Sequence, residues 1–386
     1  IRSAVNFGDK ILVARNCHKS VYHAIEINNL DPIYIMPQID KSGIQKEITK
    51  NDIENAIKAN KNIKLIVLTS PTYEGIISNI KEIVEVAHSY NIPVVVDEAH
   101  GSHLKFIEGM EKYEALNSGA DIVIQSLHKT LPALTQTAIL HIQGDLVEEK
   151  EVARELSIFE TSSPSYIFIA SIEECLDFIE KRRSLFKKYQ ENINEFYEET
   201  KKLKNLKILG NILDKQTIYD FGKIVILTDG TNLTGKELAN ILRRNYEIEV
   251  EMSYTNYVIS MTSVCDPKEN FKRLQKALFA IDKKIDNVKE KTQEYKMPKI
   301  SLPERKYSIN EALLCKEEEK ININDAEGQI SKEYIWVYPP GIPIIVPGEI
   351  INKNTIQELK DIMKTGIEIR TTNDEFPNVY IKKENI

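Results

Sequence analysis

The sequence predicts a layered α/β fold with a mainly parallel sheet, followed by a small α+β domain and a C-terminal domain. In the first 145 residues, short runs rich in Ile and Val alternate with segments of helical periodicity, which is the pattern of βαβ units. These runs do not alternate between polar and apolar residues, as expected for parallel strands that helices cover on both faces. Ligands of such sheets bind at the carboxyl ends of the strands.

The expected elements of this first part follow one another at short intervals. The clearest helix follows Asn79, which together with Glu82 resembles a capping box, and Pro93 prevents its continuation. Its apolar face comprises Ile80, Ile83, Val84 and Ala87. The expected strands are 11–14, 32–36, 65–69, 93–97, 122–126 and 137–142.

After residue 145, the sequence predicts a mainly helical stretch, then a unit of mixed helices and strands. A separate terminal domain follows. A loop at Thr161–Ser165 precedes a long helix, and charged residues 284–300 resemble a connector. The mixed unit should contain a strand at 223–227, a helix from Thr234 and strands near 248–252 and 257–262. We therefore expect four parts: a large domain at 1–145, a helical connection at 146–205, a small α+β domain at 206–285 and a C-terminal domain at 286–386.

Composition excludes several classes of function. The net charge is −7 and no long basic run occurs, which argues against nucleic-acid binding. No apolar run approaches the roughly 20 residues of a membrane span, and no signal-peptide pattern opens the chain. The four cysteines are scattered without a CxxC pair, which favours reduced thiols in a cytoplasmic protein and no metal site.

Two polar residues follow apolar strands, and together they indicate a cofactor site. Asp97 ends the run Val94–Val96, and Lys129 comes just after the strand at 122–126. Burying an ammonium is costly unless it has a partner or becomes neutral, and a neutral, oriented amine can form an imine with an aldehyde cofactor. A carboxylate and a lysine at two strand ends are the polar anchors of a pyridoxal phosphate (PLP) ring. Taken alone, Asp97 also fits a helix cap and Lys129 a surface lysine.

Nearby histidines and a serine have both functional and plain interpretations. His18 follows the first strand, where it could stack on a planar ring or serve as a structural residue. Ser126 and His128 could donate hydrogen bonds to a phosphate or to local backbone groups. His100 and His103 form an HxxH pair that suggests metal binding, but the helical HExxH pattern is absent and we expect no metal.

The sequence blocks around these residues resemble a known family. The segment SLHKTLPALTQTA (126–138) is similar to the cofactor-lysine signature of the bacterial Orn/Lys/Arg decarboxylases, PLP enzymes of the aspartate-aminotransferase fold. Pro132 is a minor departure from that pattern. Further similar blocks occur in the family's order and span nearly the whole chain: RNCHKS (15–20), SPTYEG (70–75), DEAHGSH (97–103), TSSPSY (161–166) and YPPGIPIIVPGE (338–349).

The resemblance implies a role for each matching residue. Lys129 would bind PLP covalently, Asp97 would pair with the pyridine nitrogen, and His18 would stack on the ring as a third catalytic residue. Ala99 would pack on the opposite ring face, with His100 nearby, and Ser126 and His128 would bind the phosphate. The expected substrate contacts are Thr161, Ser162 and Ser163, in a loop that could lie at a dimer interface, and Glu349.

The implied activity is decarboxylation of arginine, lysine or ornithine to a polyamine-pathway amine and CO2, by a cytoplasmic homodimer or higher homo-oligomer. In the family, a phosphate-binding loop precedes a helix N-terminus, and that loop should lie upstream of Ile1. We therefore expect an N-terminally truncated chain that binds PLP weakly. Two alternatives stay open: an aminotransferase or lyase of the same fold, and a non-catalytic relative that lacks the phosphate loop.

Overall fold

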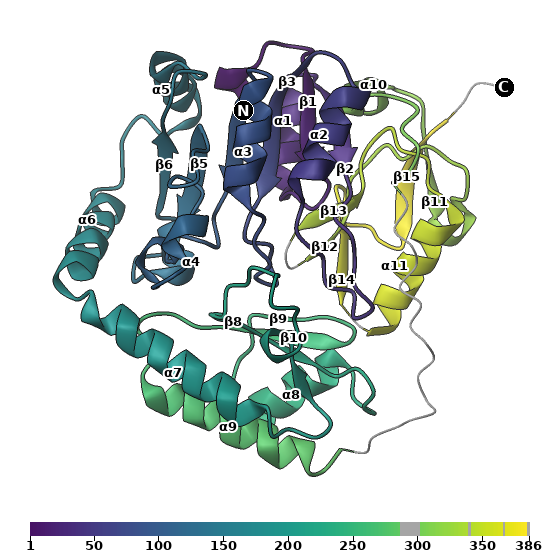
Figure 1. Cartoon of the computed structure of the whole chain (residues 1–386). Coiled ribbons are helices and arrows are strands. Elements are labelled where there is room, and N and C mark those ends of the chain that lie inside the picture. Colours follow the sequence, from purple (N-terminus) through teal and green to yellow (C-terminus); the bar gives the residue numbers. More distant parts are fainter. Residues whose placement is uncertain (286–301, 339–340, 366, 384–386) are drawn as a thin grey trace.

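The largest sheet has six strands in the order β2-β1-β3-β4-β5-β6 (Figure 1). It belongs to a computed structural model that describes residues 1–285, 302–338, 341–365 and 367–383. Strands β1 to β5 are parallel, and their apolar side chains form a continuous core. The six expected strands are all present: β1 (Lys10–Ala14), β2 (Asp31–Ile35), β3 (Ile63–Thr69), β4 (Val94–Asp97), β5 (Ile122–Ser126) and β6 (Ala138–Ile142).

Strand β6 runs antiparallel to β5, although its unalternating apolar sequence suggested a parallel strand. The connection between them contains only the four-residue helix α4 (Leu127–Thr130) and a short loop. A right-handed crossover to a parallel strand needs a dozen or more residues, so this connection can make only an antiparallel return. The result is a sheet edge at which α4 lies directly beside the carboxyl ends of β4 and β5.

Helices α1, α2 and α3 lie against the parallel strands (Figure 1). The expected apolar face of α3 is fully buried, but Asn79 does not form a capping box there. Its side-chain amide donates to Glu82 Oε1 at 2.8 Å, which turns the Asn79 oxygen away from the helix amides. The bounds of these helices are α1 (Lys19–Ile27), α2 (Lys50–Ala59) and α3 (Ile80–Ser89).

A second sheet, of order β7-β8-β10-β9, is covered by three helices and has its own apolar core (Figure 1). Its strands are antiparallel. The strand expected near 248–252 is much shorter, because α8 ends at Glu247 in the left-handed conformation and the chain pairs again only at Met252. The elements are α7 (Ser184–Thr200), β7 (Lys207–Ile208), β8 (Lys223–Leu227), α8 (Gly235–Tyr246), β9 (Met252–Ser253), β10 (Tyr257–Met261) and α9 (Lys268–Asp282).

The C-terminal part contains a three-stranded sheet, β13-β12-β14, and the pair β11-β15. Its own core lies under α11, while Ile309, Tyr334 and Val346 join the core of the largest sheet. Most of the predicted connector at 284–300 lies outside the described residues. The elements are α10 (Ile309–Leu314), β11 (Glu318–Asn322), β12 (Ile335–Tyr338), β13 (Ile342–Ile345), α11 (Lys353–Thr365), β14 (Glu368–Thr371) and β15 (Asn378–Lys382).

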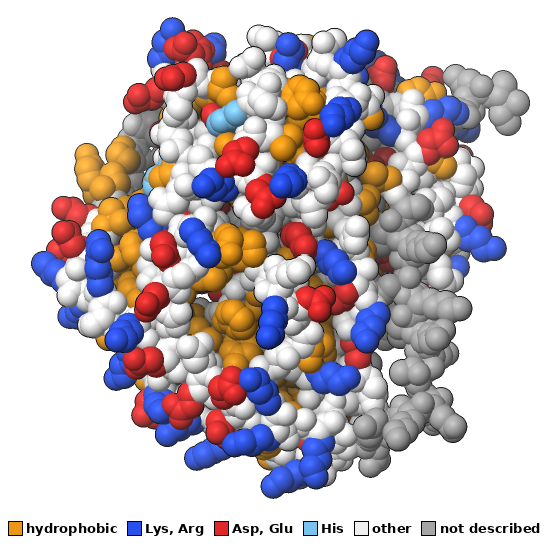
Figure 2. Space-filling model, viewed as in Figure 1, with side chains coloured by type: hydrophobic (Ala, Val, Ile, Leu, Met, Phe, Trp, Pro, Cys, Tyr) orange, Lys and Arg blue, Asp and Glu red, His pale blue; other side chains and the backbone are white. Residues whose placement is uncertain are grey.

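Helices α5 (Glu149–Phe159) and α6 (Tyr166–Lys181) connect the two sheets along one side of the molecule, with the expected loop at Thr161–Ser165 between them (Figure 1). Hydrophobic side chains gather at this edge of the surface (Figure 2). The most exposed are Phe159, Tyr166 and Ile167. Within the part of the chain that the structure describes, no helix has the length and apolar character needed to cross a membrane.

Candidate active site

Asp97 and Lys129 meet at one edge of the largest sheet. Asp97 is the last residue of β4, and Lys129 lies in α4, which begins directly after β5. Because β4 and β5 are neighbouring parallel strands, their carboxyl ends share this edge. Asp97 Oδ1 accepts the backbone N–H of Ala99 at 3.1 Å, which orients the carboxylate.

The Lys129 amine is linked through a histidine to a second lysine. Lys129 Nζ lies 3.1 Å from His100 Nε2, and Lys223 Nζ lies 2.7 Å from His100 Nδ1. Lys223 opens β8 of the second sheet and is 1% exposed. The site therefore combines residues of both sheets, and the imidazole ring of His100 joins them.

The loop at 73–75 packs around this chain of three side chains. The Tyr73 ring lies edge-on to the His100 ring, with 4.9 Å between centroids, and its hydroxyl donates to Glu251 Oε1 at 2.7 Å. Gly75 has φ +101°, and a Cβ there would lie 2.9 Å from Lys223 Cβ. Only glycine combines that backbone conformation with such a close approach. Glu74, between them, is buried and accepts from the Tyr257 hydroxyl at 3.0 Å.

Burial lowers the pKa values of the histidine and of the two lysines in this site. Desolvation, followed by the nearby Lys223 and Lys129 charges, holds the pKa of His100 well below its usual value. Desolvation also lowers the pKa of Lys129, against the opposing effect of Asp97. It lowers the pKa of Lys223 to about 8, although Asp220 acts in the other direction. An amine with a pKa of about 8 is half neutral at that pH, and its neutral form can act as a nucleophile or accept a proton.

His18 lies at the N-terminus of α1, where its side chain caps the helix by accepting the Ser20 N–H at Nδ1. The ring itself is exposed, and partial desolvation lowers its pKa. The next residue is tied to the C-terminal part, because the Lys19 N–H donates to the Gly341 carbonyl at 3.2 Å. His18 thus presents a neutral ring at a position that two parts of the chain determine.

Ser126 and His128 flank the start of α4. His128 Nδ1 lies 2.9 Å from the Thr137 carbonyl and donates to it, which leaves Nε2 for another partner. The Ser126 carbonyl accepts from the Ser102 hydroxyl at 2.9 Å, which fastens the end of β5 to the loop after β4. Both side chains are half-buried.

The HxxH pair does not converge on one point. His100 contacts the two lysines, whereas His103 Nε2 lies 3.0 Å from Asp220 Oδ1. Over residues 1–285 and the described stretches after them, no three His, Cys, Asp or Glu side chains are placed to hold a metal ion.

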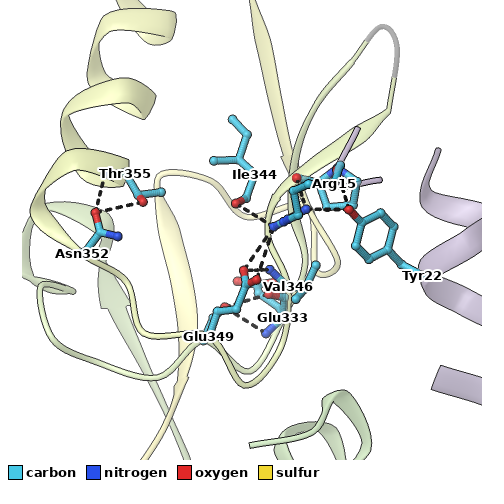
Figure 3. Close-up of polar contacts among 10 residues, drawn as sticks. Arg15, Tyr22, Glu333, Ile344, Val346, Glu349, Asn352 and Thr355 are labelled. Carbon is cyan, nitrogen blue, oxygen red and sulfur yellow. Dashed lines mark hydrogen bonds and ion pairs between the residues drawn. The ribbon is translucent and has the colours of Figure 1, made fainter. Parts of the chain in front are cut away.

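Glu349 has structural partners. It is 0% exposed and lies 3.2 Å from the guanidinium of Arg15, and it also accepts the N–H of Val346 (Figure 3). Arg15 in turn donates to the carbonyls of Pro343 and Ile344. These contacts tie the C-terminal part to the end of β1 and give Glu349 a structural role, while its predicted role in substrate binding stays a prediction.

The other expected substrate residues are all exposed. Thr161, Ser162 and Ser163 lie in the loop between α5 and α6, where the Thr161 hydroxyl donates to the Ser163 carbonyl. A cavity of about 110 Å³ instead lies between the C-terminal part and the two sheets, lined in part by Arg15, Glu74 and Glu358. Burial raises the pKa of Glu358 to about 7.

Sequence reasoning missed Lys223, Tyr73 and Glu251 as members of the site. Tyr73 lies in the loop after β3, whereas Lys223 and Glu251 come from the part of the chain that forms the second sheet. The sequence offered one weak signal for Lys223, which opens an expected strand and directly precedes an apolar run of four residues. Nothing in the spacing connects it with His100, which lies 123 positions away in the sequence.

Comparisons with known proteins identify the family of this chain. The family model of the Orn/Lys/Arg decarboxylase major domain matches residues 1–226, and that of the family's C-terminal domain matches residues 289–377. Arginine decarboxylase of Halalkalibacterium halodurans is 33% identical over 393 residues, with 100% of this chain and 79% of the relative covered. Arginine decarboxylase of Bacillus subtilis is 33% identical, with 95% and 76% covered.

Solved structures show the same fold at lower identity. The constitutive lysine decarboxylase of Escherichia coli aligns with a TM-score of 0.79 and 21% identity, over 99% of this chain and 68% of that one. The lysine decarboxylase of Francisella novicida gives a TM-score of 0.82 and 22% identity, over 98% and 66%. Both parts of the family are matched in order and the fold is shared, and so this chain belongs to the Orn/Lys/Arg decarboxylase family.

Proposed function

We propose that this chain is a PLP-dependent decarboxylase that acts on arginine. The observation that carries the proposal is the similarity of the whole chain to arginine decarboxylases at 33% identity, compared with 23% for the inducible lysine decarboxylase of Escherichia coli over 90% of the chain. The placement of Lys129 and Asp97 at adjacent strand ends supports the same chemistry.

The residues at this edge fit a PLP molecule. Among the described residues, neither Asp97 nor Lys129 takes part in an ion pair, so both are available to a ligand. The hydroxyl of Thr130, next to Lys129, is buried without a hydrogen-bond partner. The groups that would hold PLP are Lys129 covalently, Asp97 at the pyridine nitrogen, His18 and Ala99 on the two ring faces, His100 nearby, and Ser126 and His128 at the phosphate.

When bound, PLP supplies an electron sink for the carbanion that remains after CO2 is lost. The protein's own contribution is positioning and charge. Asp97, as a carboxylate, favours a protonated pyridine ring, and Lys129 attacks as a neutral amine. The low pKa of His18 keeps its ring neutral, which suits stacking more than ion pairing.

Glu251 is the carboxylate that we assign to the guanidinium of the substrate. It is exposed, it influences both Lys129 and Lys223 electrostatically, and the Tyr73 hydroxyl orients one of its oxygens. A planar guanidinium can pair with a carboxylate through two parallel hydrogen bonds, which a lysine ammonium cannot do. The Glu251→Gln variant should therefore lose discrimination between arginine and lysine.

The test is CO2 release from arginine, lysine and ornithine by the purified chain with added PLP. Arginine should give the highest kcat/KM, by about tenfold, because only its guanidinium can make two parallel hydrogen bonds to Glu251. Formation of CO2 from lysine or ornithine at an equal rate would contradict the choice of arginine. Conversion of the amino acid to a keto acid without CO2 would instead support an aminotransferase.

We further propose that a second copy of the chain covers the exposed apolar edge at α5 and α6. Phe159, Tyr166 and Ile167 are 62%, 79% and 70% exposed, which is costly for a surface in permanent contact with water. An Ile167→Asp substitution should shift the mass measured by light scattering from dimer toward monomer, whereas Leu314→Asp, at an equally exposed site in the C-terminal part, should not.

A cytoplasmic location is also part of this proposal. All four cysteines are free, and Cys17 and Cys175 are buried, as expected for a protein in a reducing compartment.

A further inference from the structure

The hydrogen bonds of His100 restrict the charges of its two lysine neighbours. A neutral imidazole has one N–H and one lone pair, and here each nitrogen faces an amine, at 3.1 Å and 2.7 Å. The nitrogen that carries the proton needs an acceptor, and an ammonium group has no lone pair to accept with. At least one of Lys129 and Lys223 must therefore be a neutral amine whenever both contacts are made and the ring is neutral.

We propose that Lys223 accepts the proton of Lys129 through His100. The N–H bond at Lys129 Nζ breaks as a new one forms at His100 Nε2, and the proton on His100 Nδ1 passes to Lys223 Nζ. The imidazole begins and ends neutral with its tautomer exchanged, the total charge is unchanged, and no other reactant is needed. Lys129 becomes the neutral amine and Lys223 the ammonium.

The groups around the two lysines favour this direction. Lys223 faces Asp220, Glu251 and Glu74, and its amine also lies 5.7 Å from the centre of the Tyr73 ring. Lys129 faces Asp97 and Glu251, and Asp97 is the carboxylate that the proposed function assigns to the pyridine nitrogen. These acidic groups and the ring oppose the desolvation of Lys223, which is the largest influence on its pKa and lowers it to about 8.

The remaining neighbours keep the ring itself neutral and fixed. His100 is affected by the charges of Lys223 and Lys129 and, more weakly, by His103 and His18, all of which oppose protonation of the ring. The edge-on Tyr73 ring and the two amine contacts hold the orientation of the imidazole. The exchange therefore needs movement of protons only.

Lys223 acts through His100 and is a positioning residue. The inference deepens the proposed function and depends on it only for the identity of Lys129 as the reactive amine. Its consequence is a Lys129 that reacts as a free amine at a pH where ordinary lysines are protonated.

The test is competitive labelling of the full chain, free of cofactor, with acetic anhydride between pH 6 and 11, with mass spectrometry to follow each lysine. In Lys223→Met, the pH midpoint for Lys129 labelling should rise by about one unit or more, a roughly tenfold loss of labelling below the midpoint. The matched control is Lys332→Met, which removes a lysine that is largely buried and paired with Glu318 in the C-terminal part, and it should leave the Lys129 midpoint in place.

His100→Asn separates the relay from simple charge repulsion. In that background, Lys223→Met should move the Lys129 midpoint by much less than in wild type, since the link between the two amines is already broken. An equal shift in both backgrounds, or no shift in either, would overturn the proposal.

A measurement on the wild-type chain keeps the inference testable if the variants do not fold. Nitrogen-15 NMR of labelled histidines, with the His100 signal assigned by its loss in His100→Asn or by its pH insensitivity, should show the Nε2–H tautomer near pH 8. A resonance that reports Nδ1–H would mean that Lys223 is the neutral amine, and the proposal would be wrong. Neither measurement needs PLP or an amino acid, so a failure here is distinguishable from a chain that does not decarboxylate arginine.

Discussion

Two buried clusters of charged residues lie within the same molecule and differ in how their charges are satisfied. Arg15 and Glu349 form an ion pair in which carbonyl oxygens and a backbone N–H complete the hydrogen bonds of both side chains. In the other cluster, Lys129 and Lys223 are joined by a neutral histidine, and no carboxylate is within ion-pair distance of either amine among the described residues. Both clusters connect parts of the chain that are far apart in sequence.

This difference distinguishes a buried cluster that only stabilises the fold from one whose groups can still react. A fully paired buried ion holds its surroundings in place and has nothing left to offer a ligand. Amines that are buried without a carboxylate partner are destabilising, and they remain available for chemistry. The four predictions that follow test this distinction.

The largest effect is expected from Lys129→Ala. Without the amine, PLP cannot be bound covalently, and decarboxylation should fall by at least about a thousandfold. Borohydride reduction followed by mass spectrometry should also find no PLP on the peptide at 126–138. The exposed Lys105 gives a control, since Lys105→Ala should leave both readouts near wild type. Retention of a tenth of the activity by Lys129→Ala would refute the assignment.

The next largest effect is expected in the structural cluster. Glu349→Ala leaves the Arg15 guanidinium buried without its counter-ion, which should cost about 3–5 kcal/mol in the free energy of unfolding, measured with urea. Arg15→Met combined with Glu349→Leu should recover most of the loss, because an apolar pair needs no counter-charge. A single variant as stable as wild type would show that the pair contributes little.

Lys223→Met is expected to raise the free energy of unfolding, whereas Glu349→Ala lowers it. The pKa of this lysine falls from 10.5 to about 8 on folding, so the folded state binds fewer protons than the unfolded state between pH 8 and 10.5. The destabilisation by Lys223 is therefore complete below pH 8 and disappears as the pH rises through 10.5. Lys223→Met should stabilise the chain by about 1–2 kcal/mol at pH 7, after allowance for the lost His100 contact, and by progressively less toward pH 10. A gain that stays constant with pH would contradict this account.

The smallest effect is expected for an exposed ion pair. Lys58 and Glu54 lie one helical turn apart on α2, with 57% and 39% of their side chains exposed. Lys58→Ala should change the free energy of unfolding by no more than about 0.5 kcal/mol, and less in high salt. A loss as large as that of Glu349→Ala would mean that burial does not explain the contrast between the clusters.

The sequence was most informative at the ends of the predicted strands, where the apolar pattern also indicates the place of the next residue in the sheet. Asp97 and Lys129 could be predicted because each follows an apolar run, and a strand end has a fixed place in a parallel sheet. The ion pair of Glu349 was not predicted, because the sequence shows an acidic residue but not the buried arginine that lies 334 positions away. The apolar pattern of β6 does not indicate its direction. That direction is set by the short connection from β5 to β6.

Lys223 and Tyr73 could not be found in this way. Lys223 contacts His100 from the second sheet, and Tyr73 contacts it from the loop after β3. Such contacts leave no periodicity in a single sequence. The expected loop at Thr161–Ser165 was located correctly, but its role in substrate binding stays a prediction. The domain boundaries stay predictions as well.

The contacts of Arg15 and Lys19 also affect when the site can be completed during synthesis. Arg15 donates to a carbonyl 328 residues further along the chain, and Lys19 donates to Gly341. At a translation rate of about 5–20 residues per second, the segment that carries His18 leaves the ribosome roughly 16–66 s before its partners do. An unfinished chain can thus contain Asp97, His100 and Lys129 while still lacking the contacts that position His18. The contacts that fix the segment around His18 therefore form only after the C-terminal part has been synthesised.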